Sequence, residues 1–439
     1  MSARKTALEA LIACRKRAAW SNGVLKDYIV RDRLDRRDAA LATRLCYGVL
    51  QNRNMLDFLL AQLLTGKIKD LHPMVRDILH LGLYQIYELD KIPDSAAVNE
   101  SVALTKKYCK LQRNAPGLVN AVLRNAVRTK GTLKVPTTLE ERYSHPAELI
   151  ELLRSYVGEE RLEPMLAANN DTPQTVVQVN TLRISTEALV ERLKAEDVTA
   201  LPHAWMPDCL VLSNTGSLEQ LDCFKEGLFY VQDAAAKLCV DCAKIPEGEH
   251  IRVLDCCAAP GGKTFAAAIA MGGKGKIRSC DVHRHKTTLI QLGATRLGLD
   301  NIVVREQDAT ENHPGWFEKM DVVLADVPCS GYGIIRKKPD IRYKNIQEME
   351  RLPELQLKIL YKQAEYVKKG GVLLYSTCTL VRRENEAVVE AFLAHRPDFE
   401  LEPLELPAVF PENHSGMLTL VPSEYDTDGF FICRLRRKA

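Results

Sequence analysis

The first 130 residues place apolar side chains at intervals of three and four, as an amphipathic helix does. The segments that show this spacing are 6–12, 39–50, 75–89 and 96–104. Pro73, Pro93 and Pro116 stand near the starts of such segments, where a missing amide donor costs least. The pattern predicts an all-α domain that ends near residue 135, at a stretch rich in Pro and Thr.

The pattern changes after residue 135. Up to about residue 225 it is mixed, with helical spacing in 147–156 and 186–194 and an extended run at 175–179. From Gly248 onward, short apolar runs alternate with helix-length stretches, which favours a mostly parallel sheet with helices on both faces. The runs predicted to be strands are 251–257, 276–282, 301–306, 321–325 and 371–376. We therefore expect a helical domain (1–135), a mixed α/β connecting domain (136–225) and an α/β domain (226–439).

Composition agrees with a globular protein of several domains. The chain has 439 residues, 46% hydrophobic and 27% charged, which is long for a single core. No apolar run reaches membrane-spanning length, and the N-terminus lacks the apolar core of a signal peptide. We therefore expect a cytoplasmic protein without a membrane partner.

The 13 cysteines are scattered, and their number is odd, which favours free thiols in a reducing compartment over a disulfide framework. Cys239 and Cys242 have the spacing of a zinc motif, but no second pair or nearby histidine accompanies them. We interpret them as one helix face and expect no metal.

The charge is divided unequally along the chain. Residues 1–130 carry 23 basic and 12 acidic side chains, a net charge of +11, and the remaining 309 residues carry −8. Residues 101–130 contain seven basic side chains and no acidic one. Any single lysine here is more simply a solvated surface residue, but the asymmetry as a whole favours a domain that binds a polyanion such as RNA.

Chemically suggestive residues stand where the predicted strands end. The first strand leads from Asp255 into a run of small residues that opens a helix. This run is Cys257, Ala258, Ala259, Pro260, Gly261, Gly262 and Lys263. Small residues let a ligand approach the backbone closely, and the amides that open a helix can meet a carboxylate or phosphate. The spacing fits neither a P-loop nor a GxGxxG dinucleotide fingerprint.

Asp281, Asp308 and Asp326 follow the next three strands. Each alone is more simply a cap or turn residue. Because ligands of such sheets bind at the carboxyl ends of the strands, we expect these aspartates and Asp255 to line one site shaped for a nucleoside.

Two cysteines also follow strands, Cys329 in Val-Pro-Cys-Ser and Cys378 in Ser-Thr-Cys-Thr. A lone free cysteine is usually a small core hydrophobe, but two at strand ends suggest covalent attack on a pyrimidine. Carbon 5 of cytosine is too electron-poor to take a methyl group from a sulfonium donor. A thiolate that adds at carbon 6 converts the ring into an enamine that can, after which the carbon 5 proton must leave.

These motifs resemble a known family. The 257–263 run, Asp326-Val-Pro-Cys329 and Ser376-Thr-Cys378 are similar to the motifs of RNA cytosine-5 methyltransferases that use S-adenosylmethionine. In the N-terminal domain, 47–50, 82–85 and 119–124 resemble the NusB-like RNA-binding domain of one bacterial branch, the Sun/Fmu (RsmB) small-subunit rRNA methyltransferases. The resemblance continues through 230–233 and 428–431 and so covers nearly the whole chain.

The resemblance implies a NusB-like helical domain joined to a Rossmann-like class I methyltransferase domain, with S-adenosylmethionine as cofactor and 16S rRNA or a small-subunit precursor as partner. The 257–263 loop would hold the methionine end of the cofactor, Asp281 the ribose hydroxyls and Asp308 the adenine amine. Asp326 would lie between cofactor and base. Cys378 would be the nucleophile, and Cys329 would assist release of the adduct. DNA methyltransferases of this chemistry take their nucleophile from a Pro-Cys motif, so the additional Thr-Cys motif indicates RNA rather than DNA.

Two positions depart from the family pattern, Gln178 where an arginine is usual and Ala235-Ala236 where a serine is frequent. Both lie outside the cofactor and cysteine motifs, whose positions are all filled. Two alternatives remain at this point. The substrate can be tRNA, since the catalytic motifs do not read the RNA, or the chain can be a non-catalytic RNA-binding assembly factor, since the helical domain alone permits it. A Rossmann dehydrogenase is the least favoured, because its glycine fingerprint is absent.

Overall fold

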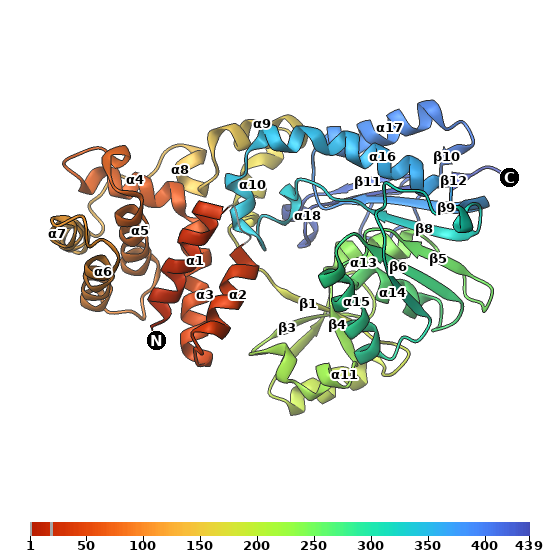
Figure 1. The fold of residues 1–439 in the computed structure, drawn as a ribbon, viewed down its shortest axis with the longest axis horizontal. Coiled ribbons are helices and arrows are strands. Elements are labelled where there is room, and N and C mark those ends of the chain that lie inside the picture. The colour runs from red at the N-terminus through yellow and green to blue at the C-terminus, as the bar shows by residue number, and fades with distance from the viewer. Residues whose placement is uncertain (1, 18–20) are drawn as a thin grey trace. The chain divides into compact units, whose positions relative to one another are not determined.

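The computed structural model describes residues 2–17 and 21–439, and these form two compact units (Figure 1). The helical unit comprises Met1–Asn170 together with Ile335–Lys344, and the sheet unit comprises Asp171–Ile334 and Asn345–Ala439. Within the described residues, no helix is both long and apolar enough to cross a membrane.

The helical unit is built of α-helices, of which the first seven share one apolar core. Its helices are α1 (Ala3–Arg17), α2 (Ser21–Arg31), α3 (Arg36–Gln51), α4 (Arg53–Leu63), α5 (Pro73–Glu88), α6 (Asp94–Tyr108), α7 (Ala115–Arg128), α8 (Leu139–Tyr143), α9 (Ala147–Val157) and α10 (Glu159–Ala168), with short 3-10 turns η1 (Ile68–Asp70) and η5 (Pro339–Tyr343). Leu8, Leu45 and Leu60 are fully buried in the core. The helical periods predicted from sequence are confirmed, and Pro73, Pro93 and Pro116 lie at helix starts.

Two of the motifs noted in this domain, 47–50 and 82–85, each contain a glycine at a close contact between helices. A Cβ atom at Gly48 of α3 would lie 2.0 Å from the Tyr84 ring of α5, and one at Gly82 of α5 would lie 2.5 Å from Leu123 of α7. Both glycines therefore let neighbouring helices pack closely, with Tyr84 and Leu123 filling the space that a larger residue would occupy.

The segment Ile335–Lys344, which follows the Cys329 motif in sequence, is anchored in the helical unit by Arg342. Only 2% of Arg342 is exposed, and its guanidinium donates to four backbone carbonyls. Nη1 lies 2.9 Å from the oxygen of Gln51, 3.2 Å from that of Tyr143 and 3.3 Å from that of Ser144, and Nη2 lies 2.8 Å from that of Asn169. Burial lowers the pKa of Arg342 to about 10, so it remains charged at neutral pH. Nearby, the Ser21 hydroxyl donates to Asp340 at 2.7 Å.

The sheet unit begins with a small antiparallel sheet in the order β2-β3-β1-β4. The elements here are β1 (Thr175–Val179), α11 (Thr186–Ala195), β2 (Thr199–Pro202), β3 (Cys209–Ser213), η2 (Leu218–Gln220), α12 (Asp222–Lys225) and β4 (Phe229–Val231). The extended run and the helix predicted in this part of the sequence are confirmed as β1 and α11.

The second sheet has eight strands in the described chain, in the order β10-β12-β9-β8-β5-β6-β7 with β11 paired to β12. Its strands are β5 (Arg252–Asp255), β6 (Lys276–Asp281), β7 (Ile302–Glu306), β8 (Met320–Asp326), β9 (Val367–Thr377), β10 (Phe399–Leu401), β11 (Met417–Leu420) and β12 (Phe430–Arg437). The five strands predicted from sequence are β5 to β9, and they pair in parallel. The three C-terminal strands are antiparallel additions that the sequence patterns did not predict.

Helices cover both faces of this sheet, as the alternating pattern predicted (Figure 1). They and the short turns are α13 (Ala234–Cys242), α14 (Gly262–Ala270), α15 (Arg284–Leu297), η3 (Pro314–Trp316), η4 (Tyr332–Ile334), η6 (Ile346–Arg351), α16 (Leu352–Ala364), η7 (Arg382–Glu384), α17 (Glu386–His395) and α18 (Pro422–Tyr425). Val253 and Leu324 join the core that contains α13, α14 and α15, whereas Val323 and Leu373 join the core that contains α16 and α17. Cys239 and Cys242 are both buried on α13, which confirms that they lie on a helix.

Replacing Arg342 with methionine keeps much of its length but leaves its carbonyl partners without donors. Because hydrogen bonds from a charged group contribute more than neutral ones, we expect Arg342→Met to reduce the free energy of unfolding by about 3 kcal/mol. Denaturant titration of the whole protein measures this. The control is Arg351→Met, which removes an exposed arginine and should leave stability within about 0.5 kcal/mol. If the two variants were equally stable, the hydrogen bonds of Arg342 would contribute nothing to the free energy of unfolding.

Candidate active site

The parallel strands bring the predicted aspartates to one edge of the sheet. Asp255, Asp281 and Asp326 are the last residues of β5, β6 and β8, and Asp308 follows two residues after the end of β7. The Gln307 amide donates to the Asp281 carbonyl at 3.1 Å, so the ends of β6 and β7 are neighbours. The expectation that these side chains gather at one edge is confirmed.

The loop from Cys257 to Lys263 turns sharply into α14. The Ala258 amide donates to the Cys280 carbonyl, and the Gly261 amide to the Ala258 carbonyl, both at 2.8 Å. Gly261 has φ +118°, and a Cβ atom there would lie 2.4 Å from the Phe265 ring. Gly261 precedes the first residue of α14 and provides no side-chain cap. The first amides of this helix are therefore available to a ligand.

Asp281 and Asp308 each have one carboxylate oxygen fixed by the local backbone. Asp281 Oδ1 accepts from the His283 amide at 3.0 Å, and Asp308 Oδ1 accepts from the amide and the hydroxyl of Thr310, each at 2.8 Å. Within the described residues, the second oxygen of each carboxylate has no hydrogen-bond partner, so it can accept from ligand hydroxyl or amino groups.

Asp326 is held by two side chains that the sequence places far away. Lys263 Nζ lies 2.8 Å from Oδ2, and the Ser376 hydroxyl donates to Oδ1 at 2.9 Å. Burial lowers the pKa of Lys263, but the Asp326 carboxylate outweighs this and keeps the net pKa above its usual value. Lys263 thus remains an ammonium, and it also lies over the Phe430 ring at 4.8 Å. The Asp326 side chain is 29% exposed, so it can still contact a substrate.

The two predicted cysteines are adjacent. Cys329 Sγ and Cys378 Sγ lie 3.2 Å apart, and both residues are half-buried. The hydrogen bond with Cys378 and burial raise the pKa of Cys329 well above its usual value. Cys329 therefore keeps its proton near neutral pH and can donate its S–H to the Cys378 sulfur.

A buried polar network that was not predicted supports the two cysteine loops. Glu384, which is fully buried, accepts from the Ser330 amide at 2.9 Å and from Gln356 Nε2 at 3.0 Å. Asn385 accepts from the Thr377 hydroxyl at 2.6 Å and donates to the Thr379 carbonyl at 3.0 Å. The signal for them in the sequence is weak: two polar residues, Glu384 and Asn385, just before an apolar helix.

Comparison with known proteins agrees with this arrangement. Three family models match the chain: 16S rRNA methyltransferase RsmB/F over residues 243–436, the NusB family over residues 1–128, and the ferredoxin-like domain of RsmF/B-like methyltransferases over residues 145–219. The probable ribosomal RNA small subunit methyltransferase B of Bacillus subtilis is 37% identical, and the match covers 100% of this chain and 99% of that protein. The chain belongs to the RsmB/F family of 16S rRNA methyltransferases.

Other members and solved structures agree. The ribosomal RNA small subunit methyltransferase B of Klebsiella pneumoniae is 31% identical over 93% of this chain and 92% of that protein. The crystal structure of a methyltransferase homologue protein from Pyrococcus horikoshii is 29% identical and matches 68% of this chain and 97% of its own, with a TM-score of 0.57. The NusB-like helical domain and the Rossmann-like methyltransferase domain expected from sequence are thereby confirmed.

S-adenosylmethionine is the cofactor of this RsmB/F family member, as expected from the sequence. The structure fits it: the uncapped start of α14 offers amide donors, and Asp281 and Asp308 offer acceptors to a nucleoside. When bound, the cofactor supplies an electrophilic methyl group. No group of three or more His, Cys, Asp or Glu side chains among the described residues is arranged to hold a metal ion.

Asp255, the fourth predicted aspartate, is the last residue of β5, just before the 257–263 loop, and is fully buried. Its Oδ2 accepts from the Thr264 hydroxyl at 2.7 Å, and Thr264 in turn contacts the Ser279 hydroxyl at 2.8 Å. Burial raises the pKa of Asp255 to about 7, against the opposing effect of the Thr264 hydrogen bond. Because this pKa is higher in the folded than in the unfolded protein, the folded state binds the proton more tightly, and stability falls as the pH rises toward 7.

We expect Asp255→Asn to remove this pH dependence while keeping an acceptor for Thr264. Between pH 5 and pH 7 the free energy of unfolding should decline more steeply in the unaltered protein than in Asp255→Asn. The two slopes should differ by at most about 1.4 kcal/mol per pH unit. Urea titrations at several pH values measure the difference. Asp300→Asn, at an exposed position, is the control and should behave like the unaltered protein. Parallel pH profiles for Asp255→Asn and the unaltered protein would contradict the prediction.

Proposed function

We propose that the protein methylates carbon 5 of a cytosine in 16S rRNA through a covalent adduct with Cys378. The observation that carries this proposal is the pair of sulfur atoms 3.2 Å apart, at the same sheet edge as Asp326. A methyltransferase acting on a nucleophilic ring nitrogen or a hydroxyl would have no need of two thiols. Carbon 5 of a pyrimidine does need one, because it becomes nucleophilic only after addition at carbon 6.

The raised pKa of Cys329 supports different roles for the two sulfurs. Cys378 adds as thiolate to carbon 6, and its S–C bond persists until carbon 5 has received the methyl group. A base from solvent then takes the carbon 5 proton. The electron pair of that C–H bond re-forms the double bond between carbons 5 and 6, and the S–C bond breaks with its electron pair on the Cys378 sulfur. Cys329, a protonated thiol within hydrogen-bond distance of the leaving sulfur, assists this last step by donating its S–H to the negative charge that forms on Cys378.

Asp326 is suited to hold the base between the cysteines and the cofactor loop. Its two oxygens are oriented by Lys263 and Ser376, so the carboxylate does not have to be ordered when a substrate arrives. As an acceptor it can take a hydrogen bond from the exocyclic amine of cytosine. This selects cytosine over uracil, which presents a carbonyl oxygen there and would leave the carboxylate unpaired.

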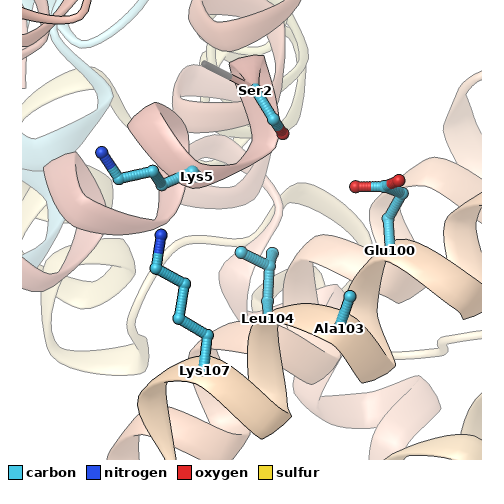
Figure 2. Close-up of a pocket in the computed structure, with 6 residues that line it drawn as sticks. All are labelled: Ser2, Lys5, Glu100, Ala103, Leu104 and Lys107. Carbon is cyan, nitrogen blue, oxygen red and sulfur yellow. The ribbon is translucent and has the colours of Figure 1, made fainter.

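The helical unit supports the choice of RNA as substrate. Basic side chains are exposed at the end of α6, on α7 and in the loop between them. They are Lys106, Lys107, Lys110, Arg113, Arg124 and Arg128, and none forms an ion pair with a carboxylate of the described residues. They are thus available to phosphates. A pocket of about 430 Å³ lies beside them, with the nitrogens of Lys5 and Lys107 on one side and the Glu100 carboxylate on the other (Figure 2).

We assign these roles to the three segments expected from the sequence, whereas the compact units of the structure divide at residue 170 and place Ile335–Lys344 with the helical unit. Residues 1–135 hold the RNA, residues 136–225 connect, and residues 226–439 carry the cofactor and the cysteines. The partner is 16S rRNA or a small-subunit precursor, and the reaction takes place in the cytoplasm.

Removing each cysteine should give a different product. Cys378→Ala should abolish methyl transfer, because no enamine forms. Cys329→Ala should transfer the methyl group but release the product slowly, and so accumulate a protein–RNA adduct that resists denaturants. Transfer of radioactive methyl groups and denaturing gels measure both. The control, Cys14→Ala in the helical unit, should release its product normally. A stable adduct with Cys378→Ala would exchange the two roles.

Neutralising four exposed side chains tests the RNA surface. We expect the variant with Lys106, Lys107, Lys110 and Arg113 all replaced by alanine to bind rRNA more weakly. The plot of log affinity against log salt should become shallower, by roughly 0.7 for each phosphate that the protein no longer neutralises. Its affinity for the cofactor should be unchanged. The matched control replaces Lys274, Lys276, Lys358 and Lys369, all exposed on the sheet unit. Equal salt slopes for the two variants would exclude this surface.

A further inference from the structure

A buried amide next to the cofactor loop has no hydrogen-bond partner. Gln232, which directly follows β4, is 7% exposed. Its Oε1 is buried without a partner, and its Nε2 makes no hydrogen bond with any described residue. A buried acceptor without a partner is costly, and native proteins usually satisfy such groups. This side chain was not among the sequence-predicted site residues.

Hydrogen bonds hold the main chain of Gln232 and of the residue after it, and this fixes the position from which the Gln232 side chain extends. Its backbone amide donates to the Val176 carbonyl at 3.2 Å, and its carbonyl accepts from Gln178 Nε2 at 3.1 Å. The next residue, Asp233, caps α13 by accepting from the Ala235 amide at 3.0 Å. These contacts tie Gln232 to the β1–β4 pair on one side and to α13 on the other.

The Gln232 amide lies against the first residue of α14. A Cβ atom at Gly262 would lie 3.1 Å from Gln232 Nε2 and 3.5 Å from Cδ. Any side chain at Gly262 would therefore press on this amide. The N-terminus of α14 is uncapped, since Gly261 forms no side-chain hydrogen bond. Two independent features thus meet here: free helix amides and an unpartnered amide that can both donate and accept.

We propose that Gln232 binds the amino-acid end of S-adenosylmethionine, and this rests on the assignment of the 257–263 loop to the cofactor. Nε2, together with the first amides of α14, donates to the α-carboxylate, and Oε1 accepts from the α-ammonium. An α-amino acid carries one acceptor group and one donor group close together, which matches the two ends of a primary amide. The adenosine end then extends toward Asp281 and Asp308, at the ends of β6 and β7 on the opposite side of β5 from β8.

Two ligands separate this proposal from the cofactor assignment. S-Adenosylhomocysteine contains the amino-acid end, whereas 5′-methylthioadenosine lacks it. We expect Gln232→Leu to weaken S-adenosylhomocysteine binding at least tenfold and to leave methylthioadenosine within twofold. Gln232→Glu should weaken S-adenosylhomocysteine further, because it places a negative charge beside the α-carboxylate. Calorimetry on the full-length protein measures all of these.

Controls show which assignment has failed. Asp281→Ala should weaken both ligands similarly, because both contain the ribose. In the ligand-free protein, Gln232→Leu should not lower the melting temperature, since the amide has no partner to lose; a clear decrease would indicate a purely structural role and overturn the proposal. Equal loss of both ligands in Gln232→Leu, or loss of neither, would also overturn it. Failure of the unaltered protein to bind either ligand would instead contradict the cofactor assignment.

Discussion

The register of β8 between its two parallel neighbours is the constraint on which the active site depends. Asp255 of β5 is paired with Leu324, and Asp326 is paired with Ser376 of β9. This pairing brings the Ser376 hydroxyl to Asp326 and directs the loops after β8 and β9 toward each other. The two loops are joined by a hydrogen bond: the Gly333 amide, in the loop after β8, donates to the Cys378 carbonyl, in the loop after β9, at 2.9 Å. A shift by one residue would turn Asp326 to the opposite face. Because both faces of the sheet are buried under helices, apolar packing on two sides opposes such a shift.

The loop that carries Cys329 is also covalently continuous with the anchor of the helical unit. Its first part is fixed in the sheet unit through Ser330 and Gly333. Its next part, Ile335–Lys344, belongs to the helical unit, where the buried Arg342 guanidinium and Asp340 are held. A continuous stretch of backbone therefore joins Cys329, for which we propose a role in product release, to the unit with the exposed basic surface. Each end is held by buried polar contacts, which depend strongly on geometry.

Local patterns predicted the parts of this molecule that depend on local physics. The strands β5 to β9 were evident because each is a short apolar run, and Asp255, Asp281, Asp308 and Asp326 were found because residues at the ends of parallel strands gather at one edge. The strands β10 to β12 pair antiparallel. The only helix described between them is α18, which has four residues, so the alternation of strands with helix-length stretches could not reveal them. Glu384, Gln356 and Arg342 were missed for another reason. Their partners lie 28 to 291 residues away in the chain, and no periodicity marks a contact of that range.

Gln232 differs from these residues because its side-chain amide has no hydrogen-bond partner among the described residues. Glu384 Oε1 and Arg342 Nε are also buried without a partner. The other polar atoms of these two side chains form hydrogen bonds that hold loops together, so much of their desolvation is offset within the protein. The Gln232 amide is desolvated to a similar degree without that compensation. Such an arrangement persists when a ligand provides the missing bonds, and its position against Gly262 at the uncapped end of α14 indicates where that ligand lies. One bound ligand would then explain both the glycine at the start of α14 and the unpartnered amide. Gly262 is small so that the helix amides and the Gln232 amide can reach the same charged group.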